Sequence, residues 1–205
     1  MDIKRNFYLP ICVFIAVFLL SSCCIRPVCK ITPKKVGGDP NNLMVYKNFS
    51  EVKIPIDSLQ EADYLGVNAV EKDIITLSQV KADVIILEVF NFYCPLCQKE
   101  APNVNTLYEL IQQSDLSGKI KIIGVGMSNS EYEVGLFKEK YVIPFPLLAD
   151  PNNGFYRIIG RVESPYFAVL KNDGNGNFER IHGVERNLPE PKDFLATVLT
   201  VSGLK

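Results

Sequence analysis

The chain has 205 residues, of which 47% are hydrophobic, 22% charged and 10% aromatic, an ordinary globular composition with length for roughly one domain. Its 22 Lys and Arg residues nearly balance 23 Asp and Glu residues, and this net charge of −1 argues against a nucleic-acid-binding protein. A single His leaves little room for a multi-histidine metal site. The six Cys residues are unevenly placed along the chain, so they do not form one disulfide framework.

The start of the chain has the layout of a secretory signal peptide. Lys4 and Arg5 precede a long uncharged run that ends in Leu-Ser-Ser-Cys at Cys23. This ending resembles a bacterial lipobox, so we expect a lipoprotein signal peptide over residues 1–22 and lipidation of Cys23. The alternative is an uncleaved anchor, because residues 7–25 approach the ~20 apolar residues that span a bilayer.

Either arrangement places the remainder of the chain outside the cytoplasm, where disulfide chemistry is permitted. Residues 23–48 are polar and contain Pro and Lys, and we expect them to form a flexible membrane tether. Cys24 and Cys29 lie in this tether and are assigned no catalytic part. Residues 49–205 are expected to form the folded domain.

The domain alternates predicted strands and helices. An apolar run broken by one Glu predicts a strand at 84–90 that is buried on both faces. The later elements expected in chain order are a helix at 95–113, a strand at 120–125, a helix at 131–141, a strand at 145–148, a helix at 153–159, strands at 166–170 and 178–182, and a helix at 191–201. The last two strands flank an Asn-Asp-Gly-Asn-Gly turn typical of a hairpin. This order predicts an α/β fold with a mixed central sheet and helices on both faces.

The motif that carries chemistry is Cys94-Pro95-Leu96-Cys97, which follows the predicted buried strand and begins the next helix. At a helix start, free backbone N–H groups and the helix dipole stabilise a thiolate. The spacing brings both sulfurs onto one side of the first turn, and Pro95 suits the first helical position. We therefore expect Cys94 to be the attacking nucleophile and Cys97 the resolving cysteine.

Two other kinds of CxxC pair need weighing. Half of a zinc site would require a second CxxC or a CxxH, which the domain lacks, and His182 stands alone. A static disulfide is disfavoured by the strand-to-helix junction. We expect redox chemistry, no metal, and no cofactor beyond a redox-active Cys94–Cys97 disulfide.

With its surroundings, this motif resembles the thioredoxin superfamily, and within it the membrane-tethered TlpA/ResA-like redoxins, over roughly residues 60–200. Glu88 lies six residues before Cys94, where thioredoxins carry a buried acid. Pro102 lies where the first long helix of the family has its kinking proline. The strand and helix expected between residues 125 and 144 resemble the insertion of TlpA-like and peroxiredoxin-like members.

The resemblance also implies roles for individual residues. Burial should raise the pKa of Glu88, which would relay protons to and from Cys97. The alternative is a Glu88 side chain that reaches solvent or a lysine at the strand end. Pro165 occupies the position of the family's cis-proline, and a cis bond would leave the backbone of Ser164 free to pair with a substrate strand.

Apolar side chains near this pair are expected to form a substrate-binding rim. Its members are Phe92, Tyr93, Pro95, Leu96 and Tyr166, although any one of them is also compatible with an ordinary core position. Tyr93 departs from the family pattern, because a Trp usually stands before the first Cys and this chain has none.

The function implied by the resemblance is that of an extracytoplasmic thiol–disulfide oxidoreductase in the bacterial cell envelope. Its partners would be disulfide-bearing protein substrates and a membrane-embedded thiol electron donor. The resemblance favours a reductant over an oxidant, for example in cytochrome c maturation.

Two alternatives on the same fold remain. A peroxiredoxin-type thiol peroxidase resembles Thr-x-x-Cys, whereas Asn91 stands three residues before Cys94 here. A Sco-like copper carrier resembles Cys-x-x-x-Cys with a nearby His, whereas this pair is one residue closer and His182 follows the hairpin. Two thiolates would still suit Cu(I).

Overall fold

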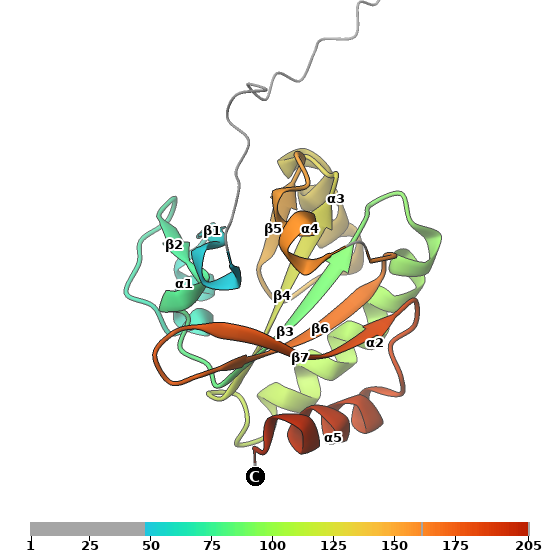
Figure 1. The fold of residues 1–205 in the computed structure, drawn as a ribbon. Coiled ribbons are helices and arrows are strands. Elements are labelled where there is room, and N and C mark those ends of the chain that lie inside the picture. Colours follow the sequence, from blue (N-terminus) through green and yellow to red (C-terminus); the bar gives the residue numbers. More distant parts are fainter. Residues whose placement is uncertain (1–47, 161, 205) are drawn as a thin grey trace, which may run out of the picture. The chain divides into compact units, whose positions relative to one another are not determined.

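The computed structural model describes residues 48–160 and 162–204 (Figure 1). The predicted signal peptide, all but the last residue of the predicted tether, and Cys12, Cys23, Cys24 and Cys29 lie outside these residues. Among the described residues, no helix is both long and apolar enough to cross a membrane.

The domain is built on a five-stranded mixed sheet with strand order β5-β4-β3-β6-β7. The strands are β3 (Val84–Phe90), β4 (Ile120–Met127), β5 (Leu147–Asp150), β6 (Tyr166–Asn172) and β7 (Phe178–Glu185). β3, β4 and β5 run parallel, and β6 and β7 are antiparallel to their neighbours. The predicted mixed α/β sheet is therefore confirmed.

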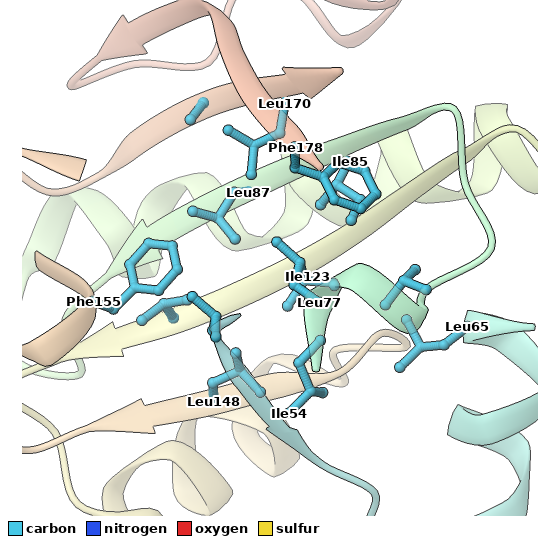
Figure 2. Packing of buried hydrophobic residues seen from close by; sticks show 14 of the residues in the cluster. Ile54, Leu65, Leu77, Ile85, Leu87, Ile123, Leu148, Phe155, Leu170 and Phe178 are labelled. Atoms are coloured by element: carbon cyan, nitrogen blue, oxygen red, sulfur yellow. The ribbon is translucent and has the colours of Figure 1, made fainter. Parts of the chain in front are cut away.

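Helices cover both faces of this sheet. The core on one face includes residues of α2 (Pro95–Gln112), α3 (Glu131–Tyr141) and α5 (Pro191–Ser202). The core on the other face includes residues of α1 (Leu59–Leu65), of α4 (Gly154–Ile159) and of the rest of the segment at 49–79. Figure 2 shows the packed aliphatic and aromatic side chains of this core. Because helices cover both faces of the sheet, its central strands are continuous apolar runs.

The central strand β3 supplies both cores. Ile85, Leu87 and Val89 belong to the α1/α4 side, whereas Val84, Ile86 and Phe90 belong to the α2 side. All seven residues of the strand are buried. Because side chains alternate along a strand, Glu88 points into the α2 side, between Ile86 and Phe90.

Element positions agree closely with expectation from residue 84 onward, with small differences at the ends. β5 begins at Leu147 and not at Phe145, because its ladder to β4 starts only at Leu147; Phe145 is a buried loop residue. The helix expected in the 125–144 insertion is α3, and the strand that follows it is β5.

The sequence predicted no helices or strands in the segment at 49–79, which is here called the ribbon. It consists of a 3-10 helix η1 (Phe49–Glu51), strand β1 (Lys53–Pro55), α1, strand β2 (Ile74–Thr76) and a 3-10 helix η2 (Leu77–Gln79). β1 and β2 are each three residues long and pair antiparallel across the intervening helix. Strands this short show no periodicity that a sequence pattern reveals.

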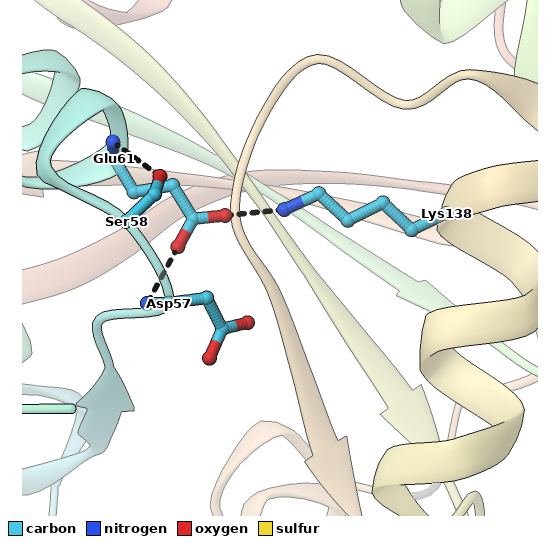
Figure 3. Close-up of polar contacts among 4 residues, drawn as sticks. All are labelled: Asp57, Ser58, Glu61 and Lys138. Atoms are coloured by element: carbon cyan, nitrogen blue, oxygen red, sulfur yellow. Dashed lines mark hydrogen bonds and ion pairs between the residues drawn. The ribbon is translucent and has the colours of Figure 1, made fainter. Parts of the chain in front are cut away.

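Polar side chains of α1 attach the ribbon to the sheet edge. One carboxylate oxygen of Glu61 accepts the backbone N–H of Asp57 at 3.0 Å and the other forms an ion pair with Lys138 of α3 (Figure 3). The Tyr64 hydroxyl accepts the N–H of Ile122 at 2.7 Å and donates to its carbonyl at 3.3 Å. Tyr64 thus provides hydrogen-bond partners for the backbone of Ile122, in the part of β4 that does not pair with β5.

Candidate active site

Cys94 lies where the buried central strand gives way to α2. It is the N-cap residue of that helix, and its sulfur accepts the backbone N–H of Cys97 at 3.3 Å. Pro95 occupies the first helical turn, as expected of a residue without an N–H to satisfy. The fold therefore places both cysteines in one helical turn.

The two thiols have opposite surroundings. Both are free, Cys94 is partly exposed, and Cys97 is fully buried. Partial burial acts to raise the pKa of Cys94, but hydrogen bonds to its sulfur from Cys97, from the side chain of Ser164 and from the helix backbone together lower it. Burial raises the pKa of Cys97 well above its usual range, and the hydrogen bond to Cys94 adds to this effect. Cys94 is therefore the more readily ionised thiol.

A second segment of chain lies against Cys94. The Ser164–Pro165 peptide bond is cis, as the family resemblance implies. The thiol of Cys94 donates to the carbonyl oxygen of Ser164 at 3.5 Å. The tertiary structure thus brings together two motifs that are far apart along the chain.

Glu88 is fully buried on the same face as Cys97. Neither carboxylate oxygen has a hydrogen-bond partner among the described residues. Burial, together with the charge of Glu100, raises the pKa of Glu88 to about 8. The alternative, a side chain that reaches solvent or a lysine, is wrong, and this acid is protonated across most of the neutral pH range.

The surface beside Cys94 is apolar and aromatic. Tyr93 is 67% exposed, Leu96 is 42% exposed, Pro95 is exposed and Phe92 is half-buried. Tyr93, Pro95 and Leu96 are therefore accessible from solvent, and their role as a substrate-binding rim stays a prediction.

Tyr166 does not lie on this rim. It is buried on the α1/α4 side of the sheet, and its hydroxyl accepts Nη1 of Arg180 at 3.3 Å. The hydroxyl also covers Gly183, where any Cβ would come within 2.1 Å of it. The expected substrate contact is corrected to a core position, because alternation along β6 sends Tyr166 away from the CxxC face.

Sequence reasoning missed two polar residues around the site, Glu100 and Asn129, and the contacts that Asn91 makes. Glu100 of α2 is buried beside Glu88 and accepts the side-chain amide of Asn103 at 3.0 Å. Asn91 and the fully buried Asn129 bind backbone of the loops on either side. The spacing of Glu100, three residues after Cys97, was a usable signal for a side chain on the buried side of the helix.

The described residues contain no group of three or more His, Cys, Asp or Glu side chains arranged to hold a metal ion. His182 lies in β7, paired with Val169, and is half-buried.

The sequence of this chain matches the model of a known protein family. The model of the AhpC/TSA family matches residues 59–194, a span that contains both cysteines, Glu88 and Pro165. The expected relationship to ResA-like redoxins is also found among curated relatives.

Two of these relatives are named thiol-disulfide oxidoreductase ResA. The protein from Halalkalibacterium halodurans is 29% identical over 109 residues, which are 51% of this chain and 57% of the relative. The protein from Bacillus cereus is 22% identical over 130 residues, 63% of this chain and 73% of the relative. The aligned region thus spans little more than half of the first relative's length.

Solved structures agree on the fold. A secreted thiol-disulfide isomerase from Corynebacterium glutamicum has a TM-score of 0.55 and 21% identity, covering 80% of this chain and 95% of its own. A secreted Mycobacterium tuberculosis disulfide oxidoreductase has a TM-score of 0.51 and 14% identity, covering 75% and 96%. The thioredoxin-like fold expected from the sequence is confirmed.

Proposed function

This chain belongs to the AhpC/TSA family, and we propose that it is a thiol–disulfide oxidoreductase that acts on protein disulfides through Cys94 and Cys97. The observation that carries this proposal is the asymmetry of the pair. A partly exposed thiol of lowered pKa lies one helical turn from a fully buried thiol of raised pKa. Such a pair suits attack by one sulfur and resolution by the other.

In the reducing direction, the Cys94 thiolate attacks one sulfur of a substrate disulfide. A mixed disulfide forms, and the other substrate sulfur leaves as a thiolate and takes up a proton. Cys97 then loses its proton and attacks Sγ of Cys94. The second substrate thiol is released, the Cys94–Cys97 disulfide forms, and two electrons have passed from the dithiol to the substrate.

We assign to Glu88 the role of accepting the proton of Cys97 and of returning it. At neutral pH this acid exchanges readily between its two forms, because its pKa is raised to about 8. The ionised form accepts the Cys97 proton during resolution, and the protonated form returns it when the pair is reduced again.

Substrate binding is proposed at the surface around Cys94. The backbone of Ser164, which precedes the cis bond to Pro165, would pair with an extended substrate segment. Tyr93, Pro95 and Leu96 would contact its apolar side chains.

The arrangement around Asn91 supports this proposal over a thiol peroxidase. Asn91 stands at the position of the peroxidase Thr, but its side-chain NH₂ donates to Met127 O and its Oδ1 accepts the N–H of Tyr93, both at 2.8 Å. Both groups are thus engaged with backbone.

We also propose where and with what partners this chemistry takes place. The lipobox at Cys23 supports lipid attachment and a place in the bacterial cell envelope, facing the extracytoplasmic side. From the resemblance to membrane-tethered TlpA/ResA-like redoxins, we propose a reductant that draws electrons from a membrane-embedded thiol donor, with cytochrome c maturation as one setting.

Substrate trapping tests the proposed activity. A full-length Cys97→Ser variant, expressed in its own cell envelope, should accumulate mixed disulfides through Cys94, because resolution is blocked. The matched Cys94→Ser variant should accumulate none. Equal yields from the two variants, or no adducts while Cys94 still reacts with a soluble maleimide, would overturn the proposal.

A further inference from the structure

The loop that leads into Cys94 is bound to the segment that begins α3. The side chain of Asn91 donates to Met127 O, and the N–H of Phe92 donates to Oδ1 of the fully buried Asn129, both at 2.8 Å. Gly126, at the end of β4, leaves room for the turn into α3, because any Cβ there would lie 2.7 Å from a Val134 methyl group and 3.2 Å from Asn129 Cβ. These contacts fix the backbone of the loop that carries Tyr93.

The side chain of Tyr93 is also held, although it is 67% exposed. Its hydroxyl donates to Oε1 of Glu133 at 2.5 Å. Its ring makes an edge-to-face contact with the Phe92 ring, with centroids 4.9 Å apart and an interplanar angle of 84°. An exposed Tyr normally samples several rotamers, but this one is restrained at both ends.

Glu133 is suited to this task because it is itself fixed. Its second oxygen accepts the N–H and the hydroxyl of Ser130, both at 2.7 Å, in a capping box at the start of α3. Hydrogen bonds from Tyr93 and Ser130 lower the pKa of Glu133. The bond from Tyr93 is therefore made to a carboxylate, which strengthens it.

We propose that Glu133 is a positioning residue for substrate docking, which acts by holding Tyr93 as a pre-ordered aromatic wall beside Cys94. A protein segment that packs on an ordered ring loses less conformational entropy than one that must order the ring on binding. The Tyr93–Glu133 bond thus favours binding of protein disulfides over small disulfides, because small disulfides are too short to contact the Tyr93 ring. This inference rests on the proposed oxidoreductase function.

The test uses the reduced full-length protein in single-turnover oxidation by two probes. Insulin supplies a protein disulfide, and 2-hydroxyethyl disulfide supplies a small uncharged one. Tyr93→Phe keeps the ring without the hydroxyl, and Glu133→Ala removes the acceptor. Each should raise the half-saturating insulin concentration by about threefold to tenfold, the range expected for one hydrogen bond, with the maximal rate and the small-disulfide rate changed much less.

Two further variants separate positioning from other effects. The double variant should be no worse with insulin than the poorer single variant, because both changes remove one bond. Glu131→Ala removes the same charge from the same helical turn, and no hydrogen bond from Glu131 to the loop at 91–93 is found among the described residues. It should stay near wild type.

Three results would overturn the inference. They are multiplicative losses in the double variant, an equal loss in Glu131→Ala, and equal losses with both probes. Failure of the wild-type protein with both probes would instead contradict the proposed function itself.

Discussion

Two buried glutamates in this domain have opposite surroundings. At the sheet edge, Glu61 of α1 is 7% exposed, and its carboxylate binds the Asp57 backbone and the Lys138 ammonium. At the centre of the sheet, Glu88 of β3 is fully buried with no hydrogen-bond partner among the described residues. A buried acid with partners holds elements together through its hydrogen bonds and ion pair, whereas one without partners keeps its proton and is available for proton transfer.

The largest expected effect that distinguishes these acids is a pH dependence of stability. Because the pKa of Glu88 is raised from 4.5 to about 8, the folded state holds one more proton than the unfolded state between these values. The free energy of unfolding should therefore fall by about 1.4 kcal/mol per pH unit across this window. The contribution is complete below pH ~4.5 and is lost as the pH rises through ~8.

Chemical denaturation of the reduced protein from pH 5 to 9 measures this slope. Glu88→Gln should remove the Glu88 contribution to it, whereas Glu61→Gln should retain that contribution. Parallel profiles for wild type and Glu88→Gln would show that the central acid does not titrate as proposed.

The next effect concerns the chemistry. Glu88→Gln keeps the shape of the side chain but cannot accept the Cys97 proton, so resolution of a mixed disulfide should slow by about tenfold to a hundredfold near pH 7. Formation of the mixed disulfide by Cys94 should change little. Rapid-quench analysis of a Cys94 mixed disulfide with a chromogenic thiol separates the two steps, and an unaltered resolution rate would remove Glu88 from the mechanism.

A smaller effect is expected at the edge acid. Glu61→Gln removes the charge that faces Lys138, and we expect a loss of about 1–2 kcal/mol in unfolding free energy, since Lys138 is partly solvated. The rate of insulin reduction should stay at the wild-type value. A loss of activity with full stability would mean that the ribbon takes part in function.

The smallest effect tests another partnered acid. Asp150 is buried at the end of β5 and accepts the backbone N–H groups of Gly154, Phe155 and Tyr156 at 2.7–3.1 Å. Asp150→Ala should lower the unfolding free energy by about 1 kcal/mol, and Asp150→Asn, which keeps one acceptor oxygen, should lower it less. Thermal melts of the two variants measure this difference, and equal melting temperatures would contradict the role of the Asp150 carboxylate in holding the first turn of α4.

Much of the fold from residue 84 onward could be predicted from the sequence, because its signals are local. The apolar run of β3 and the capping residues of α2 and α3 each lie within a few residues of the element they define. The ribbon at 49–79 could not be predicted, since its strands are short and their partners lie far along the chain.

The candidate site divides in the same way. The sequence by itself placed the two cysteines in one helical turn and an acid in the buried strand behind them, because these signals are local, and it predicted the order of attack that we propose. Only the tertiary structure decided that Glu88 has Glu100 beside it, that Tyr166 is a core residue, and that Tyr93 is held by Glu133 from 40 residues away. The physical reason is range: a helical turn or an alternating strand is set by neighbouring residues, whereas burial, hydrogen-bond partners and proton affinity depend on which distant elements the fold packs together.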